Sequence, residues 1–209
     1  MHTLETALAA LAVLSTSGCV GKDAAGDPAG GGTEDAVTEA SLHGDRVCPS
    51  HLRGRPTDNH GFGTEQIADR APELLTPDAA WVCAYAPVDT SISGTNAGAA
   101  YRWVRTGEVR QVAAADLATL STLLGQLAPA DPSQDCTADL GLRHMLLTSH
   151  DGDLTGVVVD GYGCGDVRLT DEPFRTPPGR AIQPGTVSGV LTAPPALHRL
   201  VRSLGHSDG

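Results

Sequence analysis

Residues 143–160 read RHMLLTSHDGDLTGVVVD, a stretch with a strong structural signal. Two apolar runs, residues 143–149 and 154–160, flank the polar residues His-Asp-Gly-Asp at 150–153. Asp-Gly between two such runs favours a tight β-hairpin turn, because both central residues of that turn must adopt a positive φ. The stretch therefore predicts two antiparallel strands.

The neighbouring segments extend this hairpin into a sheet. Residues 79–85 (AAWVCAY) have the pattern of a strand, and residues 101–105 (YRWVR) alternate large apolar residues with arginine. Loop-forming residues separate the two segments, so we expect a second antiparallel pair. Residues 167–169 and 185–191 are further strand candidates.

Two helices are expected beside the sheet. Between residues 113 and 128, leucines recur at spacings of three and four, and Pro129 follows the last of them. A second helix should begin at Pro194-Pro195 and end near Gly205. The predicted fold class is α+β, an antiparallel sheet with helices on one face, stapled by disulfides.

Composition limits the size of the domain and the nature of its partners. The 209 residues are 40% hydrophobic, which suits one modest core, and we place a single domain at residues 47–209. The formal net charge of −11 repels the phosphate backbone of nucleic acids, so we exclude nucleic-acid binding.

The N-terminal segment has the features of an export signal. Residues 7–14 (ALAALAVL) form an apolar run shorter than the roughly 20 residues of a membrane-spanning helix, so we interpret residues 1–18 as a signal peptide. Residues 19–46 begin with Cys19, lack aromatic residues and contain three consecutive glycines, which predicts a flexible tether. The alternative is a short buried helix in a cytosolic protein.

Small residues at 15–18 (STSG) followed by Cys19 resemble the lipobox of bacterial lipoprotein signal peptides. Thr16 stands where that family prefers an aliphatic residue, and residues 1–6 lack the usual Lys or Arg. The resemblance implies a diacylglyceryl group on Cys19, cleavage before it, and a membrane-anchored protein on the extracytoplasmic face of the cell membrane.

The domain itself resembles the small secreted proteins of unknown function that are common in actinobacteria. Three short motifs carry this resemblance: Cys-Pro at 48–49, Trp-x-Cys-x-Tyr at 81–85 and Gly-Cys at 163–164. The resemblance implies a location and an architecture, and it supplies no catalytic residue.

With Cys19 assigned to the lipid, four cysteines remain, and an even number in an exported chain favours disulfides. Four cysteines allow three connectivities, of which we expect Cys48 with Cys83 and Cys136 with Cys164. A zinc site would need a closer spacing such as Cys-x-x-Cys. A catalytic thiol at Cys164, between two glycines, is the other alternative.

Candidate catalytic and metal-binding patterns are weak. Ser149, His150 and Asp151 have the side chains of a hydrolase triad, but neighbours in sequence seldom face one another. Residues 185–189 (GTVSG) place the serine one position late for a nucleophile elbow. The acidic residues at 151, 153 and 160 do not have the spacing of a calcium loop. We therefore assign no catalytic residue, metal or cofactor.

These observations predict a lipid-anchored cell-envelope protein with a non-enzymatic binding or structural role. Its expected partners are the membrane, through the lipid, and an envelope ligand or protein. The polar, Gly-rich residues 53–70 form a candidate recognition loop. The alternative function is an envelope hydrolase that uses His144 or His150 with a nearby acid.

Overall fold

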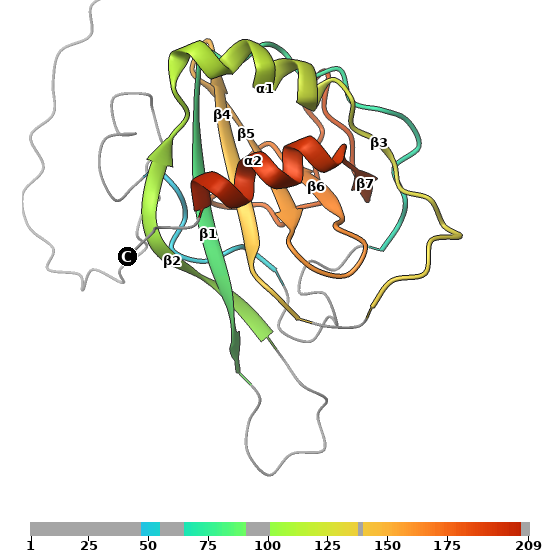
Figure 1. Cartoon of the computed structure of the whole chain (residues 1–209). Coiled ribbons are helices and arrows are strands. Elements are labelled where there is room, and N and C mark those ends of the chain that lie inside the picture. Colours follow the sequence, from blue (N-terminus) through green and yellow to red (C-terminus); the bar gives the residue numbers. More distant parts are fainter. Residues whose placement is uncertain (1–46, 55–64, 91–100, 138–139, 206–209) are drawn as a thin grey trace, which may run out of the picture. The chain divides into compact units, whose positions relative to one another are not determined.

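The structure, a computed structural model, describes residues 47–54, 65–90, 101–137 and 140–205. These residues form one seven-stranded sheet in the order β2-β1-β4-β5-β6-β7-β3, in which every pairing is antiparallel (Figure 1). The predicted signal peptide and tether, residues 1–46, lie outside the described residues. The strands are β1 (Ala79–Asp89), β2 (Tyr101–Gln111), β3 (Ala128–Pro129), β4 (Arg143–His150), β5 (Asp153–Asp160), β6 (Val167–Thr170) and β7 (Leu191–Thr192).

The hairpin predicted from residues 143–160 is confirmed. β4 and β5 pair along their whole length, from Arg143 with Asp160 to His150 with Asp153. The two turn residues, Asp151 and Gly152, have φ values of 50° and 86°. Positive φ at both positions is what a two-residue turn needs if it is to match the twist of the strands.

The second predicted pair is also present, and its strands are longer than the pattern indicated. β1 pairs with β2 on one side and with β4 on the other, which joins the two hairpins into one sheet. The register between β1 and β2 shifts between Val82 and Ala84. Gly107 of β2 has a φ of 68°, a conformation that favours glycine and accommodates such an irregularity.

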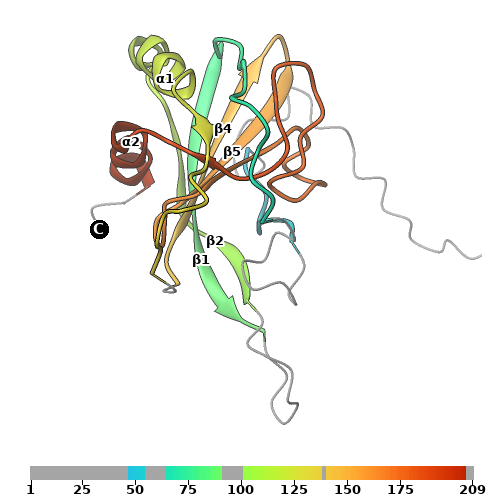
Figure 2. The ribbon, with the colours of Figure 1, turned by 90° about the vertical axis from the view of Figure 1, so that its right-hand side faces the viewer.

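Both helices lie on one face of the sheet, as predicted (Figure 2). α1 (Leu117–Leu124) and α2 (Pro195–Gly205) bury leucine and valine side chains against the strands. The shared core includes Leu120, Leu124, Leu197 and Val201 from the helices and Val82, Leu146, Val157 and Val159 from the sheet. The fold is therefore an α+β fold with helices on one face of an antiparallel sheet, and two disulfides, Cys48–Cys83 and Cys136–Cys164, staple it.

The first helix is shorter than its leucine spacing predicted. A 3₁₀ turn at Ala114–Asp116 precedes α1, which ends at Leu124. After Gly125 the backbone hydrogen bonds span three residues instead of the four of an α-helix. The Leu127 amide, for example, donates to the Leu124 carbonyl. Leu127 remains buried, and the chain leaves the helix to form β3.

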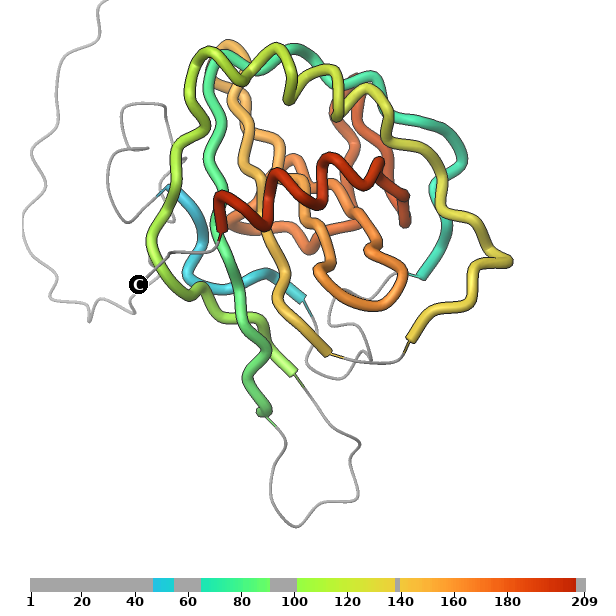
Figure 3. Tube along the Cα trace, in the orientation of Figure 1, coloured from blue at the N-terminus to red at the C-terminus, as the bar shows by residue number. Residues whose placement is uncertain are grey.

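Only the end of the strand predicted at residues 185–191 forms, as β7. Gly185 and Gly189 have φ values of 85° and 104°, which interrupt an extended strand. The residues before β7 instead form a loop beside residues 65–73. Figure 3 shows these two segments, distant in sequence, running next to each other.

The face of the sheet opposite the helices is covered by non-helical segments, residues 47–54 and 171–180 (Figure 2). They enclose a second core that includes Cys48, Cys83, Trp103, Met145 and Val158. The amide of Leu52 donates to the Trp103 carbonyl, and the Tyr85 hydroxyl donates to the Pro49 carbonyl at 2.9 Å. Neither described helix is long and apolar enough to cross a bilayer.

Candidate functional site

Both predicted disulfides are present. Cys48 joins Cys83 and Cys136 joins Cys164. The first bridge ties the segment at residues 47–54 to β1 and is buried. The second lies at the surface, where Cys136 is exposed and Cys164 half-buried. This pairing leaves Cys164 no free thiol, so it is not a nucleophile in this structure.

His150, a candidate of the hydrolase hypothesis, sits at the end of β4 and fixes the hairpin to residues 76–78. Its Nδ1 lies 2.8 Å from the carbonyl oxygen of Thr76 and 3.8 Å from Asp78 Oδ2. Asp78 Oδ2 also accepts the backbone amide of Asp151 at 2.9 Å. These contacts give His150 an anchoring role in the turn.

His144, the other histidine candidate, is 1% exposed on the face that α2 covers. The backbone of Gly205, at the end of α2, packs directly against its imidazole ring. His144 and His150 are six positions apart on β4, a distance of about 20 Å along a strand. The structure therefore places the two histidines in different surroundings.

The serine of the Gly185–Gly189 segment also has a structural role. Ser188 Oγ donates to the Ala181 carbonyl at 3.0 Å and accepts the Ala181 amide at 3.2 Å. Both interactions hold the loop at residues 179–189 closed.

A buried charge network crosses the face opposite the helices. Asp160 Oδ1 accepts Arg143 Nε at 2.5 Å, and its Oδ2 accepts Arg168 Nη1 at 3.1 Å. All three side chains are at most 5% exposed. Arg168 continues the network toward the surface, where its Nη2 lies 3.1 Å from Asp166 Oδ2 and 3.6 Å from Glu65 Oε2.

Two aromatic rings, those of Trp103 and Tyr162, lie against Arg143 of this network. The Arg143 guanidinium carbon lies 3.6 Å from the centre of the Trp103 ring, a distance typical of a cation–π contact. The Tyr162 ring is nearly parallel to Trp103, with 6.5 Å between ring centres. Burial is the main cause that raises the pKa of the Tyr162 hydroxyl above its usual value. The hydroxyl therefore stays protonated, and the stack stabilises the buried cation.

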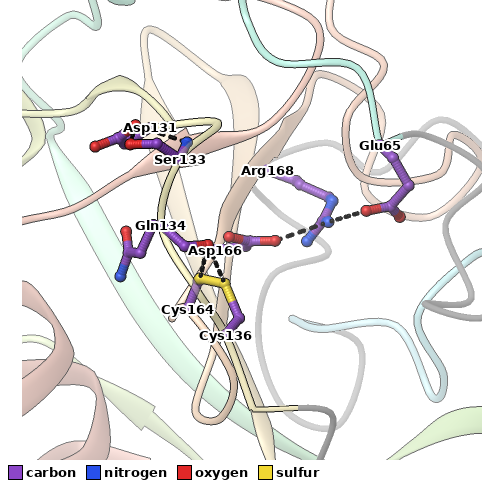
Figure 4. Close-up of a disulfide and its surroundings, with 8 residues drawn as sticks. All are labelled: Glu65, Asp131, Ser133, Gln134, Cys136, Cys164, Asp166 and Arg168. Carbon is purple, nitrogen blue, oxygen red and sulfur yellow. Dashed lines mark hydrogen bonds and ion pairs between the residues drawn. A yellow bond between two sulfur atoms is a disulfide. The ribbon is translucent and has the colours of Figure 1, made fainter.

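A small cavity of about 130 Å³ is lined in part by the two cysteines of the Cys136–Cys164 disulfide. Figure 4 shows this disulfide and the side chains around it. Glu65, Asp131 and Asp166 line it. The pKa of Asp131 is lowered because its carboxylate accepts hydrogen bonds from the Ser133 hydroxyl and amide. Among the described residues, no group of three or more potential ligands is arranged to hold a metal ion.

A larger cavity, of about 520 Å³, lies between residues 66–70 and 179–189. Ile67 forms an isolated β-bridge with Val190, the residue before β7, and Arg180 forms one with Thr170 at the end of β6. Backbone contacts therefore connect both walls to the edge of the sheet. Arg70 and Arg180 line the cavity, together with the amide side chains of Gln66 and Gln183. We call this space the loop cavity.

Only one wall of the loop cavity was indicated by the sequence. Residues 66–70 are the end of the candidate recognition loop at 53–70, of which residues 55–64 lie outside the described residues. The other wall, residues 179–189, was predicted in part as a strand. Its arginine and isoleucine had no motif or spacing that marked them as binding residues.

No protein-family model matches the chain, and no curated protein or solved structure shows a significant similarity to it.

Proposed function

We propose that this protein is a lipid-anchored cell-envelope protein, attached through Cys19 to the extracytoplasmic face of the membrane, whose domain binds an envelope ligand without catalysis. The observation that carries the proposal is the cysteine pairing. The chain has five cysteines, and four of them form two disulfides within the domain. The fifth cysteine, Cys19, is the residue to which we assign the lipid.

Disulfides support the extracytoplasmic location on chemical grounds. Structural disulfides persist in oxidising compartments and are rare in the cytosol, where thiol reductants keep cysteines reduced. The loops closed by the two bridges span 35 and 28 residues. Each bridge is expected to contribute about 3.5–4 kcal/mol under the loop-entropy model, a large part of the stability of a domain of this size.

The contacts of the histidines favour a binding role over the alternative of an envelope hydrolase. His150 anchors the hairpin turn through Thr76 and Asp78, and His144 is buried beneath α2. The loop cavity, by contrast, is open to a ligand and has charged and amide side chains in its walls. A hydrolase function would require that replacing both histidines abolish an activity of the protein.

Intact mass spectrometry of the protein from the membrane fraction of a bacterial host tests the anchor and the disulfides together. We expect a chain that begins at a diacylglyceryl-modified Cys19 and gains four alkylated thiols only after reduction. Cys19→Ser is the matched control and should lose both the lipid and the membrane association. A chain that retains Met1 and has five free thiols without reduction would contradict the proposal.

A further inference from the structure

The loop cavity has the dimensions of a small-ligand site and walls that are fixed before any ligand arrives. Its volume of about 520 Å³ lies within the roughly 300–1,000 Å³ typical of such sites. Asp171 accepts the backbone amides of both Ile182 and Gln183, which fixes the tip of the 179–189 loop. Ser188 closes the same loop on Ala181.

The opposite wall is held just as closely. The amide of Ala68 donates to the Val190 carbonyl at 3.0 Å, and the Val190 amide donates to the Gln66 carbonyl at 2.8 Å. Gly189 fits against this wall because a Cβ at its position would lie 2.7 Å from Ala68 N. A cavity whose walls are already ordered loses little conformational entropy on binding, which favours affinity.

The loop cavity is lined by two arginines, Arg70 and Arg180, and by one carboxylate, Asp69. Among the described residues, the Arg180 guanidinium forms no hydrogen bond or ion pair. Arg70 has an ion pair only with its neighbour Asp69, at 3.8 Å, and both side chains are mostly exposed. The buried Arg143 and Arg168, in contrast, are held by carboxylates of the sheet.

An apolar side chain stands beside these cations. Ile182 is 94% exposed, although its backbone is fixed by Asp171, and it lines the same cavity. A rigid loop that holds an isoleucine in water offers apolar area that a bound ligand would cover.

We propose that the loop cavity binds a small polar ligand whose carboxylate or phosphate group pairs with Arg180 and Arg70, and whose apolar part covers Ile182. This inference rests on the proposed binding function and names its ligand class. Guanidinium groups suit both anions because their paired N–H donors match two oxygens at once. Gln66 and Gln183 add donors and acceptors for polar groups next to the anion.

The test is a titration of the ¹⁵N-labelled full chain followed by amide chemical shifts. The probes are N-acetyl-leucyl-alanine with a free carboxylate, the same dipeptide with a C-terminal amide, and inorganic phosphate. We expect the acid or phosphate to cause saturable shifts at Arg70, Arg180 and Ile182, and the amide to bind at least about tenfold more weakly. The tighter of the two anions identifies which group the site takes.

Two variants locate the anion site. Arg180→Gln should weaken binding by about tenfold or more, because it removes a charge-assisted contact. Arg199→Gln is the matched control, since Arg199 is an exposed arginine on α2 and lines neither described cavity. Each variant's own amide spectrum reports whether it is folded.

The inference would be overturned by equal binding of the acid and amide dipeptides, by equal effects of Arg180→Gln and Arg199→Gln, or by the absence of saturable shifts with either anion. Shifts confined to another part of the domain would also overturn it, but they would leave a binding function standing. The lipid on Cys19 is measured separately by mass, so failure of the anchor and failure of this site are distinguishable.

Discussion

Asp160 is surrounded by two buried guanidinium groups, those of Arg143 and Arg168. A buried cation without a counter-charge strongly destabilises the folded state. Removal of the shared carboxylate therefore lowers the free energy of unfolding by more than the loss of two hydrogen bonds alone would. We expect Asp160→Asn to lower the free energy of unfolding by about 3–5 kcal/mol. Urea denaturation followed by circular dichroism measures this difference.

Asp153→Asn is the control, because Asp153 lies on the same strand and is exposed. A surface change of this kind is expected to alter stability by about 0.5 kcal/mol or less. Similar losses for the two variants would mean that the network contributes no more than an exposed carboxylate does.

His198 introduces a pH dependence through α2. Its pKa is lowered first by burial and then by the nearby Arg202, while Asp160 acts weakly in the opposite direction. The folded protein therefore keeps this imidazole neutral at pH values where the unfolded chain binds a proton. The stability from His198 is full above its ordinary pKa of 6.5 and declines as the pH falls below that value.

We therefore expect the wild-type chain to lose more stability between pH 7.5 and pH 5.5 than His198→Gln does. Urea midpoints of both proteins at the two pH values provide the measurement. Parallel loss in the two proteins would assign the pH dependence to other groups.

At the scale of elements, substitutions at two glycines distinguish the cost of backbone strain from the cost of steric overlap. Gly152 and Gly189 both have a positive φ. Gly152 in the β4–β5 turn has open space around the position of a Cβ, whereas Gly189 has backbone atoms 2.7 Å away. Gly152→Ala should cost about 1 kcal/mol, from strain alone. Gly189→Ala should cost more, because residues 66–68 must also move away from the loop.

Thermal unfolding of both variants measures this comparison, and amide spectra of Gly189→Ala should change at the walls of the loop cavity. Equal losses of stability in Gly152→Ala and Gly189→Ala would show that residues 66–68 move without an energetic cost. The wall of the loop cavity would then not be rigid.

The elements that the sequence predicted well are those defined by neighbours in the chain. The turn at Asp151 and Gly152 depends on local backbone chemistry, so residues 143–160 were predicted almost to the residue. The helix at 113–128 was overextended because Leu127 is buried after the helix has ended, and burial alone continues the leucine spacing.

For the whole molecule, the fold class was predictable. The favoured disulfide pairs are present, although the sequence alone does not choose among the three connectivities. The loop cavity was not predictable. Its two walls are more than 100 residues apart and meet through long-range backbone contacts such as Ile67 with Val190. Asp171 fixes the loop by accepting amides 11 and 12 residues further along the chain. No periodicity or short motif encodes such contacts, so a single sequence does not reveal them.

The two disulfides differ in their exposure to solvent. Cys48 and Cys83 are at most 2% exposed, while Cys136 is exposed. Thiol–disulfide exchange requires direct attack on a sulfur atom, so access controls the rate in the folded state. We expect a mild dithiol to reduce the Cys136–Cys164 bridge first, while the Cys48–Cys83 bridge should be reduced only when the domain unfolds.

Timed alkylation with mass spectrometry should therefore show a folded species with two modified cysteines, 136 and 164, before any species with four. The double variant Cys136→Ser/Cys164→Ser should remain folded and be less stable by about 3–4 kcal/mol, the loop-entropy contribution of one bridge. Replacing Cys48 and Cys83 with serine should cost more, because it also places two hydroxyls in the core around Trp103 and Met145. Reduction of both bridges at the same rate in the folded protein would contradict this prediction. It would mean that the second core, on the face of the sheet opposite the helices, exposes the Cys48–Cys83 bridge to the dithiol without global unfolding.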